Sequence, residues 1–394
     1  MRKATHPPTA EPHPRHHAVP PYLLMSMAAC DGAWEAPVGM RDFMARPSDR
    51  GGRESPSPGP EARTRIATRA RRTLLLDQAL LHGRATVPRD IGRLVGPAGR
   101  LTRTISDAQG VETTPGAVAR TEGREPVEDE DANRAYAGLG AVHRFLVAML
   151  GRNALDGAGL DLGGTVHYGL HYANAFWDGT QMVMGDGDGE IFGSFASSLS
   201  VIAHELGHGL LQFTTNLEYR GQSGALNESM ADILGVLVEQ FVAGQDAADA
   251  SWLIGEGLFT DKVRGRAMRS LAAPGTAYDD PILGKDPQPA TMAGYVDTEE
   301  DNGGVHLNSG IPNHAFYLFA TALGGNAWET AGDLWFNVIA TRALPEDADF
   351  GTFAEQTLLQ ARRDHGAGSD VELALAKAWD AVGVEPRVLD TAGQ

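Results

Sequence analysis

The clearest helical pattern in the chain lies between residues 131 and 150, where apolar side chains recur at spacings of three and four. Its apolar positions are Tyr136, Leu139, Val142, Phe145, Leu146 and Met149. Two shorter apolar segments, 164–168 and 181–184, predict β-strands. Asp178-Gly179 is a dipeptide typical of a two-residue turn between antiparallel strands. The pattern therefore predicts a long helix among short strands.

From residue 199 onward, nearly the whole sequence has a helical pattern. Residues 352–355 and 369–372 fit the capping box that begins a helix, and Gly366 fits a helix end. We therefore expect an α+β fold with a β-rich lobe at residues 101–198 and an α-helical lobe at residues 199–394. A binding site is expected in the cleft between the two lobes.

The first hundred residues differ from the rest in composition. Residues 1–100 carry 16 Lys and Arg against 9 Asp and Glu, a net charge of +7, whereas residues 101–394 carry 17 against 42, a net charge of −25. Residues 1–100 also hold 13 of the 22 prolines. This division predicts a basic arm attached to an acidic body.

Residues 1–18 are rich in proline and histidine, and this composition predicts disorder. The histidines of the segment are His6, His13, His16 and His17. They could bind a metal ion, but a solvated tail is the favoured interpretation. Residues 19–30 lack the unbroken apolar stretch of a signal peptide, so we expect a cytoplasmic precursor or release by a non-classical route.

Several classes of protein are excluded by composition. No segment approaches the roughly 18 consecutive apolar residues of a membrane-spanning helix. The formal charge of −18 argues against a nucleic-acid-binding protein, and the single cysteine, Cys30, excludes an intrachain disulfide. Two less favoured alternatives are that Cys30 is lipid-modified and that its thiolate binds a metal.

A His-Glu-x-x-His sequence occupies residues 204–208 of a helical stretch. The spacing of four places His204 and His208 on one face, one turn apart, as two ligands of a tetrahedral zinc ion require. Glu205 then lies beside the metal, where it can take a proton from water. A chance match on a surface helix is the alternative.

A second helical stretch supplies candidate partners for these histidines. Glu228 and Asp232 lie four residues apart among apolar residues, where a carboxylate is costly to bury unless it meets a cation or a donor. Glu228 as a third zinc ligand and Asp232 as the acceptor that orients a histidine ring would satisfy both. A solvated helix face is the alternative.

A third segment, 301–317, contains a glycine pair followed by His306 and a helix start near Pro312. His306 on this expected loop could donate to a developing oxyanion, with Asp301 holding its ring in the cationic form. A packed loop histidine without a functional role is the alternative.

Five segments together resemble the thermolysin family of zinc metallopeptidases, in family order over about residues 103–394. They are residues 174–179, 185–189, 204–208, 224–232 and 301–310. The Val19–Leu24 segment and the short arm resemble the protealysin-like subgroup. The resemblance implies a thermolysin-like two-lobe peptidase with zinc in the cleft, preceded by a propeptide at residues 1–100 whose end lies between residues 74 and 103.

The resemblance also implies residue roles. His204, His208 and Glu228 would bind Zn2+, with Asp232 supporting His204. Glu205 would act as general base, while Tyr219 and His306, the latter supported by Asp301, would stabilise the tetrahedral intermediate. A substrate would add as a strand at Asn174 and Ala175, with Arg269 binding its carbonyl. The implied pocket residues, whose apolarity implies cleavage on the amino side of bulky hydrophobic residues, are Phe192, Phe195, Val201, Ile254, Leu258 and Met268.

Calcium is expected at most as one weak Ca2+ site, at Glu239 and Glu256. Family members with paired calcium ions have acids where this chain has Ser200 and Ser251, and Ca2+ needs about 6–8 oxygen ligands. The Gly185–Gly189 stretch is interpreted as a turn at the cleft rather than as a calcium loop.

The expected activity is therefore that of a zinc-dependent neutral endopeptidase made as an autoprocessed precursor. Its expected partners are peptide and protein substrates and its own propeptide as an intramolecular inhibitor, with no nucleic acid, no membrane and a monomeric state. The alternatives are a zinc hydrolase of another amide or ester class and a non-catalytic zinc-stabilised binding protein.

Overall fold

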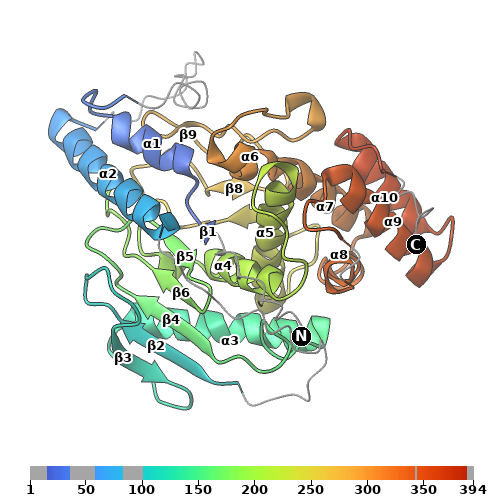
Figure 1. The fold of residues 1–394 in the computed structure, drawn as a ribbon, viewed down its shortest axis with the longest axis horizontal. Coiled ribbons are helices and arrows are strands. Elements are labelled where there is room, and N and C mark those ends of the chain that lie inside the picture. Colours follow the sequence, from blue (N-terminus) through green and yellow to red (C-terminus); the bar gives the residue numbers. More distant parts are fainter. Residues whose placement is uncertain (1–15, 36–57, 83–100, 342–343, 388–394) are drawn as a thin grey trace, which may run out of the picture.

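The computed structural model describes residues 16–35, 58–82, 101–341 and 344–387, which form a region built around a β-sheet and a region built of helices (Figure 1). Apolar side chains from both regions belong to one continuous core. The α+β fold expected from the sequence is confirmed. Within the described residues, no helix combines the length and the apolar composition that crossing a membrane requires.

The sheet has six strands in the order β1-β5-β6-β4-β2-β3. They are β1 (His16–His17), β2 (Arg103–Asp107), β3 (Ala117–Thr121), β4 (Leu162–Val166), β5 (Ala175–Trp177) and β6 (Gln181–Met184). β4 is parallel to β2 and β6, and the other neighbours are antiparallel. The predicted hairpin is confirmed, because β5 and β6 pair with Ala175 opposite Met184, but residues 178–180 join the strands instead of the expected two residues.

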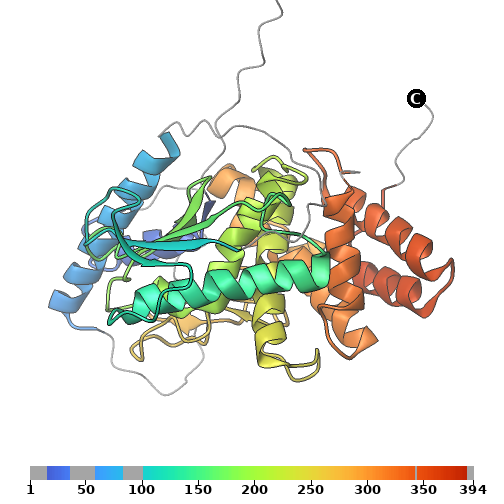
Figure 2. The same ribbon diagram turned by 90° about the horizontal axis from the view of Figure 1, so that it is seen from below.

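One long helix, α3 (Glu130–Leu150), packs against this sheet and extends toward the helical region (Figure 2). Asp129 caps its first turn by accepting hydrogen bonds from the amides of Asp131 and Ala132, and Gly151 ends it in the left-handed conformation. The residues that predicted this helix from their spacing include Leu139 and Phe145, which are buried. The predicted helix is confirmed.

The helical region contains seven α-helices within the described residues. They are α4 (Leu199–Gln212), α5 (Gly221–Ala243), α6 (Asp301–Asn308), α7 (Gly310–Leu323), α8 (Thr330–Ala340), α9 (Phe350–His365) and α10 (Asp370–Ala381). The expected caps at Ser369 and Gly366 are confirmed. The expected helix start at Thr352 is wrong, because Asp349 accepts a hydrogen bond from the Thr352 amide and α9 begins at Phe350.

The expectation that nearly all residues after 199 are helical is wrong for residues 251–300. This segment consists of turns, one short 3-10 helix (Met292–Gly294) and short strands. The strands are β7 (Leu253–Ile254), β8 (Arg269–Ser270), β9 (Asp279–Asp280) and β10 (Gly284–Lys285), paired as β7–β8 and β9–β10. Aspartate side chains replace a regular backbone ladder here, since Asp280 and Asp286 each accept several backbone amides.

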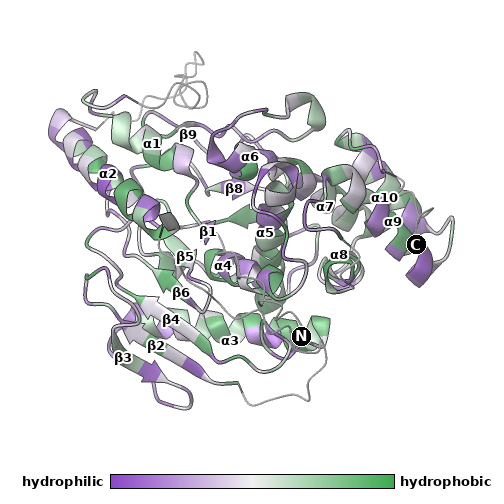
Figure 3. Cartoon of the chain, in the orientation of Figure 1, coloured by the Kyte–Doolittle hydropathy of each residue, from purple (hydrophilic) through white to green (hydrophobic). Residues whose placement is uncertain are grey.

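The arm contributes β1 and two helices, α1 (Pro21–Ala29) and α2 (Pro60–His82), which pack against each other. Figure 3 shows hydrophilic and hydrophobic turns side by side on α2. Residues 1–15 of the expected disordered tail lie outside the described residues. The expectation is wrong for residues 16–18, because β5 supplies hydrogen-bond partners for them and their side chains are buried.

The packing of α4 on α5 brings the chemistry-bearing segments of the two helices together. Gly207 on α4 faces Ala231 on α5, and a Cβ atom at Gly207 would lie 2.8 Å from the Ala231 Cα atom. A methyl group cannot approach a backbone atom this closely, so the glycine sets the distance between the two helices.

We expect Gly207→Ala to lower the free energy of unfolding by about 1–3 kcal/mol, because the added methyl group pushes α4 away from α5. Urea denaturation would measure the change. Gly59→Ala is a matched control, since a Cβ atom there would meet nothing within 4 Å. Equal unfolding midpoints for the two variants would contradict the role of this close approach.

Candidate metal centre

Two imidazole rings on α4 face the same point in the interior of the protein. The Nε2 atoms of His204 and His208 lie 3.1 Å apart, and both side chains are fully buried. Burial, together with the neighbouring His16 and His204 rings, lowers the pKa of His208 well below its ordinary value. His208 is therefore neutral, as a metal ligand must be.

Glu228 on α5 supplies a carboxylate at the same point. Its Oε2 atom lies 3.5 Å from His204 Nε2 and its Oε1 atom 3.6 Å from His208 Nε2. Zinc binds nitrogen and oxygen at about 2.0–2.2 Å, so ligand atoms around a tetrahedral ion lie roughly 3.3 Å apart. The three side chains therefore have the spacing and the chemistry of a catalytic zinc site.

Two buried oxygen atoms at this point favour the binding of a cation. Among the described residues, Glu228 Oε2 and Glu205 Oε1 accept no hydrogen bond although both are buried. A buried carboxylate oxygen without a donor is costly unless a positive charge lies beside it. The donor set and these two oxygens fit zinc.

Each histidine is oriented by a group on α5. His204 Nδ1 lies 2.8 Å from Asp232 Oδ1, as expected from the sequence, and His208 Nδ1 lies 2.8 Å from Asn227 Oδ1. An acceptor at Nδ1 places the proton there and leaves the Nε2 lone pair for a metal. The sequence analysis did not identify a role for Asn227, although Asn227 directly precedes the candidate ligand Glu228.

Asp232 is held in a network of buried polar groups. Its carboxylate accepts from Arg269 Nε at 2.9 Å and from Asn313 Nδ2 at 2.9 Å. Burial opposes ionisation, but the charge of Arg269 and the hydrogen bonds from Arg269 and the His204 ring outweigh it and hold the pKa of Asp232 well below its usual range. Asp232 is therefore an anion that links the His204 ring to Arg269.

Glu205 lies on α4, and its side chain contacts the β5 strand. Its Oε2 atom accepts a hydrogen bond of 2.8 Å from the Trp177 amide, and its side chain is fully buried. Burial and the nearby Glu228 carboxylate raise the pKa of Glu205 well above its ordinary value. A carboxylate in this environment can both take and return a proton.

Two donors lie on the opposite side of Glu228. The Tyr219 hydroxyl donates to Glu228 Oε1 and lies 3.4 Å from His306 Nε2. His306 Nδ1 lies 2.7 Å from Asp301 Oδ1. Burial alone would lower the pKa of His306, but the carboxylates of Glu228 and Asp301 raise it to about 9, so the ring is cationic at neutral pH.

His306 lies on a helix rather than on the expected loop. The helix α6 is interrupted at Asn302, Gly303 and Gly304, which have left-handed φ angles of 51°, 85° and 75°. A Cβ atom at Gly303 would lie 2.9 Å from the Gly221 amide nitrogen at the start of α5. The glycine pair therefore permits the close approach that brings His306 to the metal centre.

The predicted substrate-binding edge is occupied by the arm. β1 pairs antiparallel with β5, the Ala18 amide donates to the Ala175 carbonyl at 2.9 Å, and the Val19 amide donates to Asn174 Oδ1 at 2.8 Å. Arg269 Nη1 donates to the Ala18 carbonyl at 3.1 Å. The arm thus contacts all three groups that were expected to bind a substrate backbone.

The six residues of the expected apolar pocket are all buried in the continuous core. They are Phe192, Phe195, Val201, Ile254, Leu258 and Met268. Ile254 and Met268 lie on either side of the β7–β8 pairing, where the Met268 amide donates to the Ile254 carbonyl at 2.9 Å. The structure thus gathers them, and their role in a pocket stays a prediction.

The two candidate calcium ligands have partners within the protein. Glu239 accepts from the Ser200 amide at 2.9 Å, and Glu256 pairs with Arg266 at 3.0 Å. Neither belongs to a group of metal-binding side chains among the described residues. A calcium ion at this position stays a prediction.

A separate group of side chains that could hold a metal ion consists of Asp131, His167 and Asp186. The ring of His167 is bound on one side by Asp186 at 2.7 Å and on the other by Asp129 at 2.9 Å. The hydrogen bond to Asp186 and that to Asp129 outweigh partial burial and raise the pKa of His167 to about 9. Both nitrogens therefore carry protons, and the cluster is an ion-paired group.

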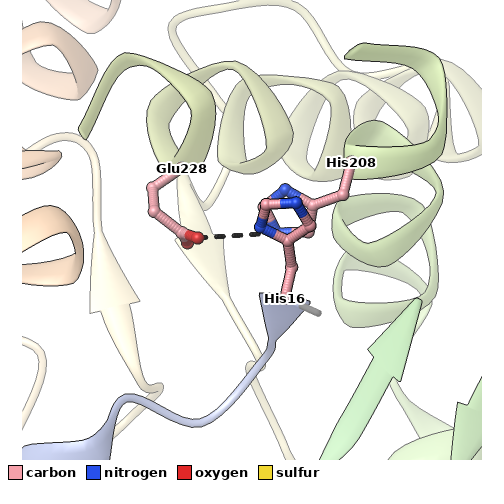
Figure 4. Close-up of side chains that lie close together, drawn as sticks. All are labelled: His16, His208 and Glu228. Atoms are coloured by element: carbon pink, nitrogen blue, oxygen red, sulfur yellow. Dashed lines mark ion pairs between the residues drawn. The ribbon is translucent and has the colours of Figure 1, made fainter. Parts of the chain in front are cut away.

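Cys30 lies at the end of α1, where its thiol donates to the Arg63 carbonyl at 3.3 Å. Burial raises the pKa of this thiol to about 11. The alternative in which Cys30 is a thiolate ligand to the metal does not fit this position. His16 of the arm instead lies against His208, a contact that the sequence analysis missed (Figure 4).

Comparison with known families matches two family models to this chain. "Thermolysin metallopeptidase, catalytic domain" covers residues 102–212, and "Thermolysin metallopeptidase, alpha-helical domain" covers residues 215–384. The two matched segments meet after α4, whereas the sequence analysis placed the boundary between the two lobes before α4.

Relatives and a solved structure agree with this match. The chain is 48% identical over 320 residues to the extracellular metalloprotease of Pectobacterium carotovorum subsp. carotovorum, covering 81% of this chain and 90% of that protein. It is 46% identical over 292 residues to protease PrtS of Photorhabdus sp., covering 74% and 78%. The precursor of protealysin, a metalloproteinase from Serratia proteamaculans, is 42% identical with a TM-score of 0.76, covering 94% and 99%.

The expectation of a cytoplasmic precursor or non-classical release is contradicted by these relatives. The Pectobacterium relative is named an extracellular metalloprotease, which points to secretion. The expectation rested on the composition of residues 19–30 alone. The structure places part of that segment in α1, which packs on the body, so its composition reflects this packing.

The two family models together cover more than half of the chain, and the structure brings together candidate metal-binding side chains from both matched segments. The family uses zinc, and the donor set described above fits it. The chain belongs to the thermolysin family of metallopeptidases, is protealysin-like, and is a neutral zinc metalloendopeptidase.

Proposed function

We propose that this peptidase is a latent precursor, in which the arm occupies the cleft, and that the mature enzyme cleaves on the amino side of bulky hydrophobic residues. The observation that carries the proposal is the antiparallel pairing of His16–His17 with β5, continued by the contacts of Ala18 and Val19. The structural similarity to the precursor of protealysin supports it.

The backbone of the arm indicates the path that the backbone of a bound substrate would follow. Addition to a sheet edge gives affinity through main-chain hydrogen bonds and leaves side-chain pockets to give specificity. Ala18 takes the position whose carbonyl meets Arg269, and the His17 carbonyl lies 3.3 Å from His306 Nε2. The His17–Ala18 peptide bond therefore lies where we propose that a substrate bond reacts.

We propose roles for the surrounding side chains. Zinc held by His204, His208 and Glu228 would supply Lewis acidity and lower the pKa of a water molecule to about 7. Glu205 would take the proton of that water and return it to the departing amine. Tyr219 and the cationic His306 would donate to the oxyanion.

The proposed specificity follows from the side chain that stands at the Ala18 position. The residue whose carbonyl binds Arg269 is the one that follows the cleaved bond, so its side chain decides where the chain is cut. The six buried apolar residues of the expected pocket favour a bulky hydrophobic side chain there. Alanine at position 18 would fill such a pocket poorly.

Burial rather than surface charge holds the arm in place. Arg65 pairs with Glu190 and Arg72 with Glu112, but both arginines are about half exposed, and such pairs contribute only about 0.2–1 kcal/mol each. Leu23 and Leu24 of α1 are fully buried, at about 1.5–3 kcal/mol for each such side chain. The opposite charges of the basic arm and the acidic body therefore make the smaller contribution to docking.

A buried acid of the arm adds specificity to this docking. Asp77 on α2 accepts from Asn174 Nδ2 at 3.0 Å and from the Tyr172 hydroxyl at 2.6 Å. Since Asn174 Oδ1 binds the Val19 amide, the arm engages both ends of the Asn174 amide. We therefore propose that the arm is an intramolecular inhibitor.

The two alternative functions have less support. A hydrolase for small esters or amides does not require the extended track formed by Asn174, Ala175 and Arg269, and a non-catalytic protein does not require Glu205 and His306. For the oligomeric state we propose a monomer, because only seven large hydrophobic side chains among the described residues are exposed. They are Leu75, Val111, Val118, Val147, Leu170, Val242 and Leu373.

We expect Glu205→Gln to keep the fold and the zinc content but to lower turnover by about 10²–10⁴-fold or more, since amide nitrogen cannot take the proton. Casein hydrolysis and elemental analysis would measure the two effects. Glu130→Gln, at the exposed pair with Arg134, is the matched control and should retain activity. Equal hydrolysis by both variants would overturn the role of Glu205.

We expect Asn227→Ala to weaken zinc binding by about 10–100-fold, because His208 loses the acceptor that fixes its tautomer and orientation. Competition with a chelator would measure the affinity. Asn337→Ala removes a half-buried asparagine whose side chain donates to Asp333 on the same helix, and should leave zinc affinity unchanged. Similar affinities for the two variants would show that Asn227 does not orient the ligand.

We propose that maturation cuts the chain between residues 83 and 103. The earlier part of the expected window, Leu74–His82, belongs to α2, whereas a substrate must be extended to pair with β5. Residues 83–100 lie outside the described residues. Amino-terminal sequencing of the matured protein should therefore begin after His82, and a terminus inside α2 would refute the proposal.

A further inference from the structure

His16 of the arm lies among the side chains that bind the metal. Its ring stacks on the His208 ring, with centroids 4.1 Å apart and planes at 13°. On its other side it meets the edge of the Tyr219 ring, with centroids 4.2 Å apart. Its ring therefore fills the space between a zinc ligand and a proposed oxyanion donor.

His16 also has the spacing of a metal ligand. His16, His208 and Glu228 each offer a ligand atom, and these atoms lie within 4.8 Å of one another (Figure 4). Ligand atoms on one tetrahedral zinc lie roughly 3.3 Å apart, so small rotations of the His16 side chain would bring its nitrogen to the ion. The side chain is only 6% exposed, so water does not compete for it freely.

The neighbouring histidine is directed elsewhere, as the alternation of side chains along a strand requires. His17 packs its ring against Phe176, with centroids 5.6 Å apart, and its Nδ1 atom lies 3.6 Å from Asp77. The two residues are chemically identical and adjacent, but only His16 reaches the metal centre. His17 is therefore an internal control for the effect of His16.

We propose that His16 is a zinc ligand in the precursor, where it takes the coordination position that the mature enzyme leaves to water. This inference rests on the proposed binding of zinc by His204, His208 and Glu228. A catalytic zinc site has three protein ligands and an open fourth position, and imidazole is among the common ligands of zinc. A fourth protein ligand makes the site closed, like that of a structural zinc.

The proposal explains why the arm is not cut at the His17–Ala18 bond. The backbone at His17 and Ala18 follows the course proposed for a substrate, with carbonyl groups at His306 and Arg269. A bond held in this way would be cut if water were present at the metal. With His16 in the position of that water, the His17–Ala18 bond persists and the arm blocks the cleft.

The alternative is that His16 only stacks on His208, and a phenylalanine separates the two cases. Phenylalanine at position 16 keeps a planar ring for stacking but has no nitrogen to bind zinc. The full-length chain with Glu205→Gln, which is expected not to process itself, provides the background. In it, His16→Phe is compared with His17→Phe as the matched control.

X-ray absorption at the zinc edge would count the imidazole ligands of each zinc-loaded protein. We expect three imidazoles in the background protein and in His17→Phe, and two in His16→Phe. Zinc release to a chelator should also be faster in His16→Phe, by at least the roughly tenfold that loss of an outer hydrogen-bond partner costs. His16→Ala with added imidazole should restore the third imidazole, which guards against a failure of the Phe variant to dock.

The outcomes distinguish this inference from the proposed function. Two imidazoles in every protein, with stoichiometric zinc, would overturn the role of His16 and leave the zinc peptidase intact. Failure of every protein to bind zinc would overturn both. A count that stays at three in His16→Phe but falls in His17→Phe would also overturn the inference, because the third imidazole would then belong to His17.

Discussion

The distance between α4 and α5 is the constraint on which the rest of the structure depends. Two imidazoles come from one helix and a carboxylate from the other, and they meet only because Gly207 lets the α4 backbone approach Ala231. The helices also carry the two acceptors that fix the imidazole rings. A cation at this point would offset the cost of burying carboxylates among apolar residues. The same contact thus serves the fold and the chemistry.

Local sequence was sufficient for the parts of the site that lie within one element. The spacing of His204 and His208 is a property of a single helix, and the turn at Asp178-Gly179 is a property of four residues. Residues 251–300 could not be predicted in this way, because aspartate side chains such as Asp280 and Asp286 hold their turns together. Asn227 likewise acquires its role only from a ring on another helix.

The arm illustrates a limit of composition as a guide. Prolines and histidines predicted a solvated tail, and residues 16–18 would form one if the body were absent. They are ordered because β5 offers an unpaired edge and α1 offers apolar side chains to the shared core. The expectation about secretion failed for the same reason, since the apolar residues of α1 serve packing and say little about export. Long-range contacts decided both questions.

The arm is fastened to the body far from the place where the chain is proposed to be cut. The ladder at β1 and the buried residues of α1, which end at Ala28, lie more than fifty residues before the window at 83–103. Cutting one peptide bond there removes a tether but none of these contacts. The severed fragment can therefore stay bound, and the rate at which activity appears is set by its dissociation or digestion. Activation is then a two-step process in which dilution favours the free enzyme by suppressing rebinding, and the liberated fragment is a candidate inhibitor of other copies of the mature enzyme.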